Sequence, residues 1–212
     1  MQKRILCFGD SNTHGYTPLG ERYDESVRWP TAMARLLGEG CTVIEEGLNG
    51  RTCVFDDPVG GGYRSGLDYL PPCLMTHNPL DVVILMLGTN DTKARFNMSV
   101  AAIARAMMQL VHVVKQYAVK ANGEPSRIIV ASPAPILDCL IDRRDVEIFG
   151  AQAPEVSRGL AREYRKVSKL MRCDFFDAGT ASEVSTVDGV HLTEEVHRRL
   201  AHAMAEKIRT IL

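Results

Sequence analysis

The chain has 212 residues, of which 45% are hydrophobic and 24% are charged. This length and composition are typical of a soluble globular protein, and we expect one domain over residues 1–212. Its 25 basic and 26 acidic residues leave a formal net charge of −1. Nucleic-acid-binding proteins carry a basic surplus, and anionic membranes attract one, so we expect neither nucleic acid nor membrane as a partner.

The first apolar run, residues 5–8, is too short for the core of a signal peptide, and no stretch approaches the length of a membrane span. The six cysteines include no Cys-x-x-Cys pair and no Cys/His spacing typical of zinc sites. These features predict a cytoplasmic protein with no metal site and no cofactor. We also expect a homo-oligomer.

Short apolar runs that end in turn residues alternate with helical patterns along the chain. The runs predict five strands, at residues 5–8, 42–46, 82–87, 127–132 and 173–177. Apolar residues at helical spacing predict helices at residues 29–38, 69–77, 99–119, 155–170 and from Thr193 to the C-terminus. Residues 137–153 show neither pattern, and a lid and an oligomer contact both remain open for them.

Strands that alternate with helices predict an α/β fold with a doubly wound parallel sheet. Residues 82–87 form the most apolar run, which favours a central strand covered on both faces. Right-handed crossovers bring the carboxyl ends of all strands to one edge of the sheet, where such folds bind ligands. Three strands end in small polar residues, so we expect Ser11, Asn49-Gly50 and Asn90 to meet at this edge.

The first strand ends at Gly9-Asp10-Ser11, which presents a hydroxyl there. A serine in this position more often caps a helix than acts in catalysis, so the interpretation depends on partners elsewhere in the chain. Acyl transfer from an ester requires a nucleophile, a base, a group that orients the base and donors for the oxyanion. Ser11 can attack, His191 can take its proton because imidazole titrates near neutrality, and Asp188 can hold the imidazole. The N–H groups of Ser11 and Gly50 and the amide of Asn90 can form the oxyanion hole.

Four separated blocks of the sequence resemble the SGNH hydrolases, also called the GDSL-type lipase/esterase family. They are Gly-Asp-Ser at 9–11, Asn-Gly-Arg-Thr at 49–52, Gly-Thr-Asn-Asp at 88–91 and Asp-Gly-Val-His at 188–191. Longer runs at 4–11, 27–29, 43–48 and 87–93 resemble the arylesterase branch, some of whose members also transfer acyl groups to alcohols. The resemblance implies a flavodoxin-like, three-layer α/β/α fold, a triad and oxyanion hole made of the residues above, and no cofactor.

We therefore predict a serine esterase that hydrolyses short-chain acyl or aryl esters through an acyl-enzyme, with acyl transfer to alcohols as a further activity. Its expected partner is a small-molecule ester. A carbohydrate-ester deacetylase of the same family is the alternative among enzymes. Outside enzymes, the alternative is a non-catalytic α/β module whose serine only contacts a small ligand.

Three further residues are candidates for substrate binding. Asn12 stands where the family often has leucine, so we expect it to change substrate shape rather than chemistry. His14 could line the pocket or make a local turn, and Trp29 could wall the pocket or pack in the interior. Asp10 is expected to cap the helix behind Ser11, and Asp91 to support the site indirectly. The remaining histidines are interpreted as turn, surface or packing residues: His77, His112, His197 and His202.

Overall fold

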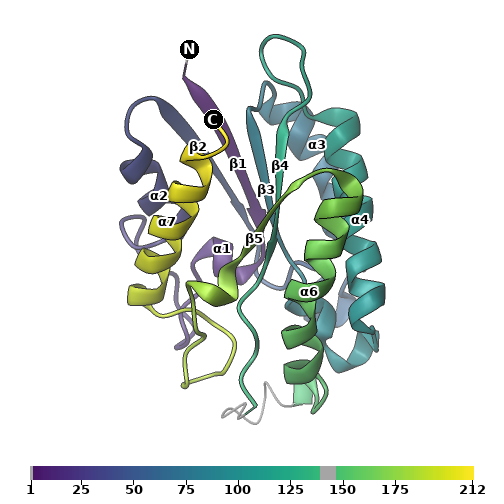
Figure 1. The fold of residues 1–212 in the computed structure, drawn as a ribbon. Helices are drawn as coiled ribbons and strands as arrows, with labels where there is room; N and C mark the ends of the chain where they lie inside the picture. The colour runs from purple at the N-terminus through teal and green to yellow at the C-terminus, as the bar shows by residue number, and fades with distance from the viewer. Residues whose placement is uncertain (1, 139–146) are drawn as a thin grey trace.

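The computed structural model describes residues 2–138 and 147–212, so residues 139–146 of the segment 137–153 lie outside the described residues. A five-stranded parallel sheet runs between two layers of helices (Figure 1). The strands are β1 (Lys3–Gly9), β2 (Cys41–Gly47), β3 (Val82–Met86), β4 (Arg127–Ser132) and β5 (Asp174–Asp177), in the spatial order β2-β1-β3-β4-β5. This is the flavodoxin-like order, so the predicted fold class and its five strands are confirmed.

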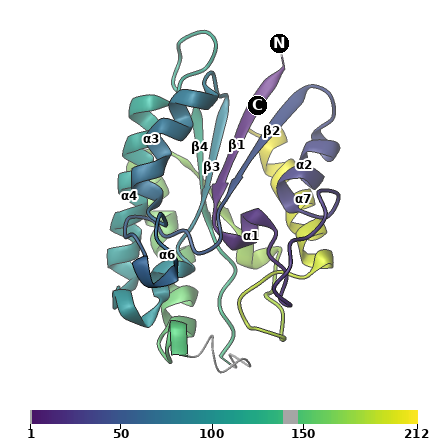
Figure 2. The same cartoon turned by 180° about the vertical axis from the view of Figure 1, so that it is seen from behind.

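The helices cover both faces of the sheet, with α2 and α7 on one side and α3, α4 and α6 on the other (Figures 1 and 2). α3 begins three residues before the predicted start, because Ser65 caps it and its Oγ accepts a hydrogen bond from Asp68 N–H at 3.2 Å. A short helix, α1, follows β1 directly. The bounds are α1 (Ser11–His14), α2 (Trp29–Leu37), α3 (Gly66–His77), α4 (Val100–Tyr117), α6 (Ala153–Met171) and α7 (Glu194–Arg209).

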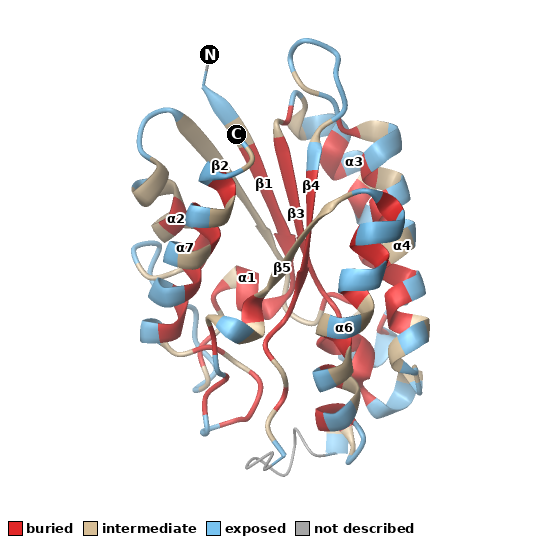
Figure 3. Cartoon of the chain, in the orientation of Figure 1, coloured by how far each residue is buried: buried red, intermediate tan, exposed pale blue. Residues whose placement is uncertain are grey.

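The inner strands are buried on both faces, as the apolar run of β3 predicts (Figure 3). Successive side chains of a strand point to opposite faces, so β1 divides its residues between the two layers. Leu6 and Phe8 belong to the core under α3, α4 and α6, whereas Ile5 and Cys7 belong to the core under α2 and α7. The sheet is therefore held rigidly from both sides, which fixes where the strand ends lie.

Two glycines let α1 pack directly against the ends of β1 and β2. A Cβ on Gly9 would lie 2.0 Å from the Oγ1 of Thr13, and one on Gly47 would lie 2.1 Å from the backbone nitrogen of His14. Asp10 caps the helix as predicted, because its Oδ1 accepts a hydrogen bond from Asn12 N–H at 3.0 Å. The close packing and the cap together hold Ser11 at the carboxyl edge of the sheet.

Across residues 2–138 and 147–212, the structure contains no helix with the length and apolar character needed to span a membrane. The five cysteines in these ranges are all free thiols.

His197 is a polar group placed in the core beneath α7. Its side chain has no exposed surface, and its Nδ1 accepts a hydrogen bond from Trp29 N–H at 3.3 Å. Its Nε2 has no partner within the described residues. Burial, and to a smaller degree the nearby His191 and Arg28, lowers the pKa of His197 to about 4. His197 is therefore neutral in the folded protein under conditions where an unfolded chain would protonate it.

This depressed pKa predicts that the protein loses stability on acidification. An unfolded histidine titrates near 6.5, so between pH 6.5 and pH 4 the unfolded chain binds more protons than the folded one, and stability falls as the pH falls. We expect His197 to contribute a loss of about 2 kcal/mol in the free energy of unfolding between pH 7 and pH 4.5. Urea unfolding at both pH values measures it, with His197→Gln as the variant that keeps an acceptor but does not titrate. Equal losses in the two proteins would contradict the assignment.

Candidate active site

The structure joins three residues that lie far apart in the sequence. Ser11 is the first residue of α1, and Asp188 and His191 lie in the loop that precedes α7. The Nε2 of His191 lies 3.0 Å from the Oγ of Ser11, and its Nδ1 lies 2.6 Å from the Oδ2 of Asp188. This is a continuous chain of hydrogen bonds from a carboxylate through an imidazole to a hydroxyl, the arrangement that activates a serine for attack on a carbonyl.

Asp188 also shapes the loop that carries His191. Its Oδ1 accepts hydrogen bonds from the N–H groups of Val190 and His191, both at 3.0 Å. Burial opposes ionisation of this carboxyl, but the bonds from the His191 ring and from the two backbone N–H groups outweigh it and lower the pKa of Asp188. An ionised Asp188 accepts the Nδ1 proton of His191, which leaves Nε2 free to accept the proton of Ser11.

Hydrogen-bond donors face the same pocket from the other side. Gly50 has a φ of 78°, which glycine adopts without strain. Asn90 follows β3, and its Nδ2 donates to the carbonyl oxygen of Arg51 at 3.1 Å, which leaves its second amide hydrogen available. Within the described residues, the N–H groups of Ser11 and Gly50 donate to no protein acceptor. Free donors of this kind are what a developing oxyanion requires.

Two buried charged residues, Arg51 and Asp91, hold these donors in place. A role for Arg51 was not predicted from the sequence. Arg51 lies over the ring of Phe8, with 4.2 Å from its Cζ to the ring centroid, and its Nη1 donates to the carbonyl oxygens of Gly9 and Glu46. Asp91 accepts the N–H of Cys53 with both carboxylate oxygens, at 2.9 and 3.1 Å. Burial raises the pKa of Asp91 to about 6. The loop that bears Gly50 is thus tied both to the strand ends and to the turn that bears Asn90.

A cavity of about 220 Å³ joins the hydroxyl to these donors. The ring of Tyr16 packs against that of His191 with 4.9 Å between centroids, and Lys93 pairs with Asp57 at 3.1 Å. Beyond His191 and the residues expected at this edge of the sheet, none of the lining residues was predicted from the sequence, because no local pattern marks them. The lining is Ser11, Tyr16, Asn49, Gly50, Asn90, Lys93, Ile148, Phe149, Val190 and His191.

Known proteins resemble this chain over most of its length. Residues 7–199 match the model of the GDSL-like lipase/acylhydrolase family. The chain belongs to this family. The prediction of an SGNH hydrolase, a carboxylic ester hydrolase, is thereby confirmed at the level of the family, and the non-catalytic module is disfavoured.

Two solved structures resemble this GDSL-like hydrolase over its whole length. An aryl esterase from M. smegmatis is 41% identical, with a TM-score of 0.93 over 99% of this chain and 100% of that chain. A carbohydrate acetylesterase from Sinorhizobium meliloti is 38% identical, with a TM-score of 0.93 over 100% of both chains. Among curated proteins, no sequence matches significantly.

In this GDSL-like hydrolase, Asn12 lies away from the cavity rather than in its lining. Its Nδ2 donates to the carbonyl oxygen of Val190 at 3.2 Å, and its Oδ1 accepts from Leu192 N–H at 3.1 Å. These bonds hold the backbone on both sides of His191, and the Asn12 side chain is buried. Through these bonds Asn12 positions His191, and its effect on substrate shape remains a prediction from the sequence.

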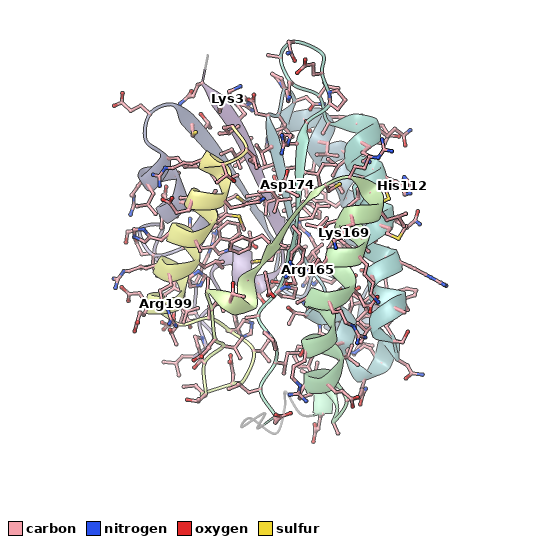
Figure 4. All side chains as sticks on the ribbon, viewed as in Figure 1. Lys3, His112, Arg165, Lys169, Asp174 and Arg199 are labelled. Carbon is pink, nitrogen blue, oxygen red and sulfur yellow. The ribbon has the colours of Figure 1, made fainter. Side chains whose placement is uncertain are left out.

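The other histidines and Trp29 also lie outside the cavity. Trp29 has no exposed surface and packs in the core under α7, which favours interior packing, one of the two roles left open by the sequence. His14 ends α1 and is absent from the cavity lining. Burial, and to a smaller degree Arg22, lowers the pKa of His14. His112 is exposed on α4 (Figure 4).

A group of potential metal ligands lies outside the catalytic cavity. The sequence shows no zinc-type spacing, yet the structure brings potential ligand atoms of Glu46, Cys73 and His77 within 4.8 Å of one another. Their separation in the sequence hides the group, because Glu46 lies on β2 while the other two lie on α3.

Proposed function

We propose that this hydrolase cleaves small, short-chain esters by covalent catalysis at Ser11. The observation that carries the proposal is the hydrogen-bonded chain Ser11–His191–Asp188, which opens into the same cavity as the donors of Gly50 and Asn90. A nucleophile, a base, an orienting carboxylate and oxyanion donors are the four parts that acyl transfer requires.

The reaction proceeds in two halves. The Oγ of Ser11 attacks the ester carbonyl carbon while the Nε2 of His191 takes the hydroxyl proton. The tetrahedral oxyanion accepts hydrogen bonds from Ser11 N–H, Gly50 N–H and the Asn90 amide, and His191 then returns the proton to the leaving alcohol. Water repeats the sequence on the acyl-enzyme and releases the acid. Asp188 stabilises the imidazolium form of His191 but does not take the proton.

The walls of the cavity favour a short acyl group. Ile148, Phe149 and Val190 line it, and Phe149 and Val190 pack together in a small apolar cluster with Ile136 and Ala153. A volume of about 220 Å³ is below the range of roughly 300–1,000 Å³ usual for drug-sized ligands. An acetyl or butyryl group with a small alcohol suits this space better than a long acyl chain.

The alcohol half of the ester is less tightly specified by the cavity. One solved relative is an aryl esterase and the other a carbohydrate acetylesterase. Lys93 lines the cavity beside the apolar wall, and its charge pairs with Asp57, a buried carboxylate that also pairs with Arg95. A polar wall of this kind can bind sugar hydroxyls, which favours an acetylated carbohydrate as the second candidate substrate. Rates on phenyl acetate and on an acetylated monosaccharide separate the two.

An alcohol that replaces water on the acyl-enzyme would make the protein an acyltransferase. The chemistry of the second half-reaction is the same for both acceptors, so the site supports both outcomes. The ratio of free acid to new ester, measured with phenyl acetate in aqueous alcohol, distinguishes hydrolysis from transfer.

The cavity predicts a chain-length preference that Phe149 controls. We expect p-nitrophenyl acetate and butyrate to be hydrolysed faster than the octanoate. Because each methylene in an apolar pocket is worth roughly 10-fold or more, Phe149→Ala should raise the octanoate-to-acetate ratio of kcat/KM by about 10-fold. Phe55→Ala is the matched control, since Phe55 stacks on Phe96 and does not line the cavity. Faster octanoate than acetate hydrolysis in the unaltered protein would refute the proposed acyl specificity.

A further inference from the structure

A group of potential metal ligands lies between the edge strand β2 and helix α3. Cys73 and His77 are four residues apart on α3 and therefore lie one turn apart on the same face. Glu46 lies on β2 opposite them, and its Oε1 is 2.8 Å from the Nε2 of His77. One ligand atom from each of the three residues lies within 4.8 Å of those of the other two.

These three side chains are of the types that zinc binds. Zinc takes thiolate, imidazole and carboxylate ligands at about 2.0–2.3 Å in a tetrahedral arrangement. Ligand atoms at those distances from one ion lie within about 4 Å of each other, so small side-chain rotations would complete the contacts. An ion pair of Glu46 with His77 accounts for two members of the group but not for the thiol of Cys73 beside them.

We propose that Glu46, Cys73 and His77 form a binding site for one Zn²⁺ ion, with a fourth position open to water. The side chains of His77 and Glu46 are 26% and 19% exposed, so an ion can enter from solvent. Glu46 also lines a cavity of about 550 Å³ together with Arg51, Tyr69 and other residues, which leaves room for the fourth ligand.

The surroundings both support and oppose the ion. Tyr69 donates its hydroxyl to the Oε2 of Glu46 at 3.3 Å, which orients the carboxylate as outer-shell partners of metal ligands do. Burial, and to a smaller degree Glu46, raises the pKa of Cys73 to about 12, so an incoming ion must displace the thiol proton. The guanidinium of Arg51 lies near both Glu46 and Cys73 and repels a cation. These costs lower the affinity but leave the ligand geometry intact.

The proposed site is separate from the catalytic cavity. None of its three residues lines the cavity that contains Ser11 and His191, as far as the described residues define it. The test therefore measures metal binding alone, and its outcome does not depend on the proposed ester hydrolysis.

Titration of the whole protein with Co²⁺, a spectroscopic substitute for zinc, tests the proposal. We expect one bound ion with a thiolate-to-cobalt charge-transfer band, and we expect Zn²⁺ to displace it. Cys73→Ala should abolish the band, and His77→Ala should weaken binding by about 10-fold or more, as loss of a ligand or its support does. Cys173→Ala is the matched control, because Cys173 is a free, half-buried thiol at the other edge of the sheet. It should leave the band and the affinity unchanged.

Two results would overturn the site. One is the absence of Co²⁺ and Zn²⁺ binding to the unaltered protein at millimolar metal. The other is a charge-transfer band that persists in Cys73→Ala. Circular dichroism verifies that each variant is folded. If Cys73→Ala or His77→Ala does not fold, Glu46→Gln takes its place in the test, because it keeps the shape of the side chain. It too should weaken binding of Zn²⁺ by about 10-fold or more, and unchanged affinity in this variant would also reject the proposal.

Discussion

Replacement of Ser11 by alanine is expected to reduce kcat/KM for p-nitrophenyl acetate by about 10⁴-fold or more, because the covalent route is lost and only the oxyanion donors and binding remain. The fold should not change. Ser11 is 6% exposed, and its Oγ is hydrogen-bonded to the Nε2 of His191. Removal of one oxygen atom therefore leaves no large cavity, and the urea midpoint should stay close to that of the unaltered protein.

Covalent labelling makes the same prediction independent of substrate choice. A serine-reactive phosphonate should add once to the unaltered protein and not to Ser11→Ala. Ser168→Ala is the matched control, because Ser168 is buried on α6 and its Oγ donates to the carbonyl oxygen of Tyr164, away from the cavity. It should retain both labelling and hydrolysis. A folded Ser11→Ala protein that hydrolyses the ester near the normal rate would exclude Ser11 as nucleophile.

The fold could be predicted from the sequence because its signals are local. Each strand is a short apolar run, and Gly9 and Gly47 end two of the runs where α1 packs against the strand ends. Ser99 and Thr193 mark the starts of α4 and α7, and each caps its helix through its side-chain oxygen. Parallel strands and right-handed crossovers then bring the blocks at Ser11, Gly50 and Asn90 to one edge without further information.

The parts of the site that were missed depend on contacts between distant segments. Asn12 was expected to change substrate shape because it stands where the family often has leucine, but its side chain bonds the backbone on both sides of His191, about 180 positions later. Trp29 was ambiguous because an aromatic residue suits a pocket wall and a core equally well. Phe149 belongs to a segment with no periodic pattern, so nothing in the sequence places it beside Ser11.

The proposed metal ligands were missed for a related reason. The Cys-x₃-His spacing on α3 puts Cys73 and His77 on one face, which was a usable signal. The third residue, Glu46, lies on a strand that precedes α3, and only the packing of α3 beside β2 brings it near.

Location in the cytoplasm and assembly into a homo-oligomer remain predictions from the sequence.

A double substitution tests whether Asp188 acts through His191. Asp188→Asn places an amide NH₂ where Oδ2 now accepts the Nδ1 proton, so the imidazole would be held in the other tautomer with Nε2 protonated toward Ser11. In that tautomer His191 cannot take the serine proton. We expect a fall of about 10⁴-fold in kcat for Asp188→Asn, and at least as large a fall for His191→Ala.

The combined variant decides the question. If Asp188 acts only through His191, its substitution has no further effect on kcat once His191 is absent. The double variant Asp188→Asn with His191→Ala should therefore be little slower than His191→Ala alone. His112→Ala is the matched control, because His112 is exposed on α4 and should neither slow the reaction by itself nor alter the effect of Asp188→Asn. If the effects of Asp188→Asn and His191→Ala instead add in free energy, Asp188 does not work through the imidazole. Another carboxylate must then orient His191. The separate contribution of Asp188 would come from the hydrogen bonds that it accepts from two backbone N–H groups, which fix the shape of the loop.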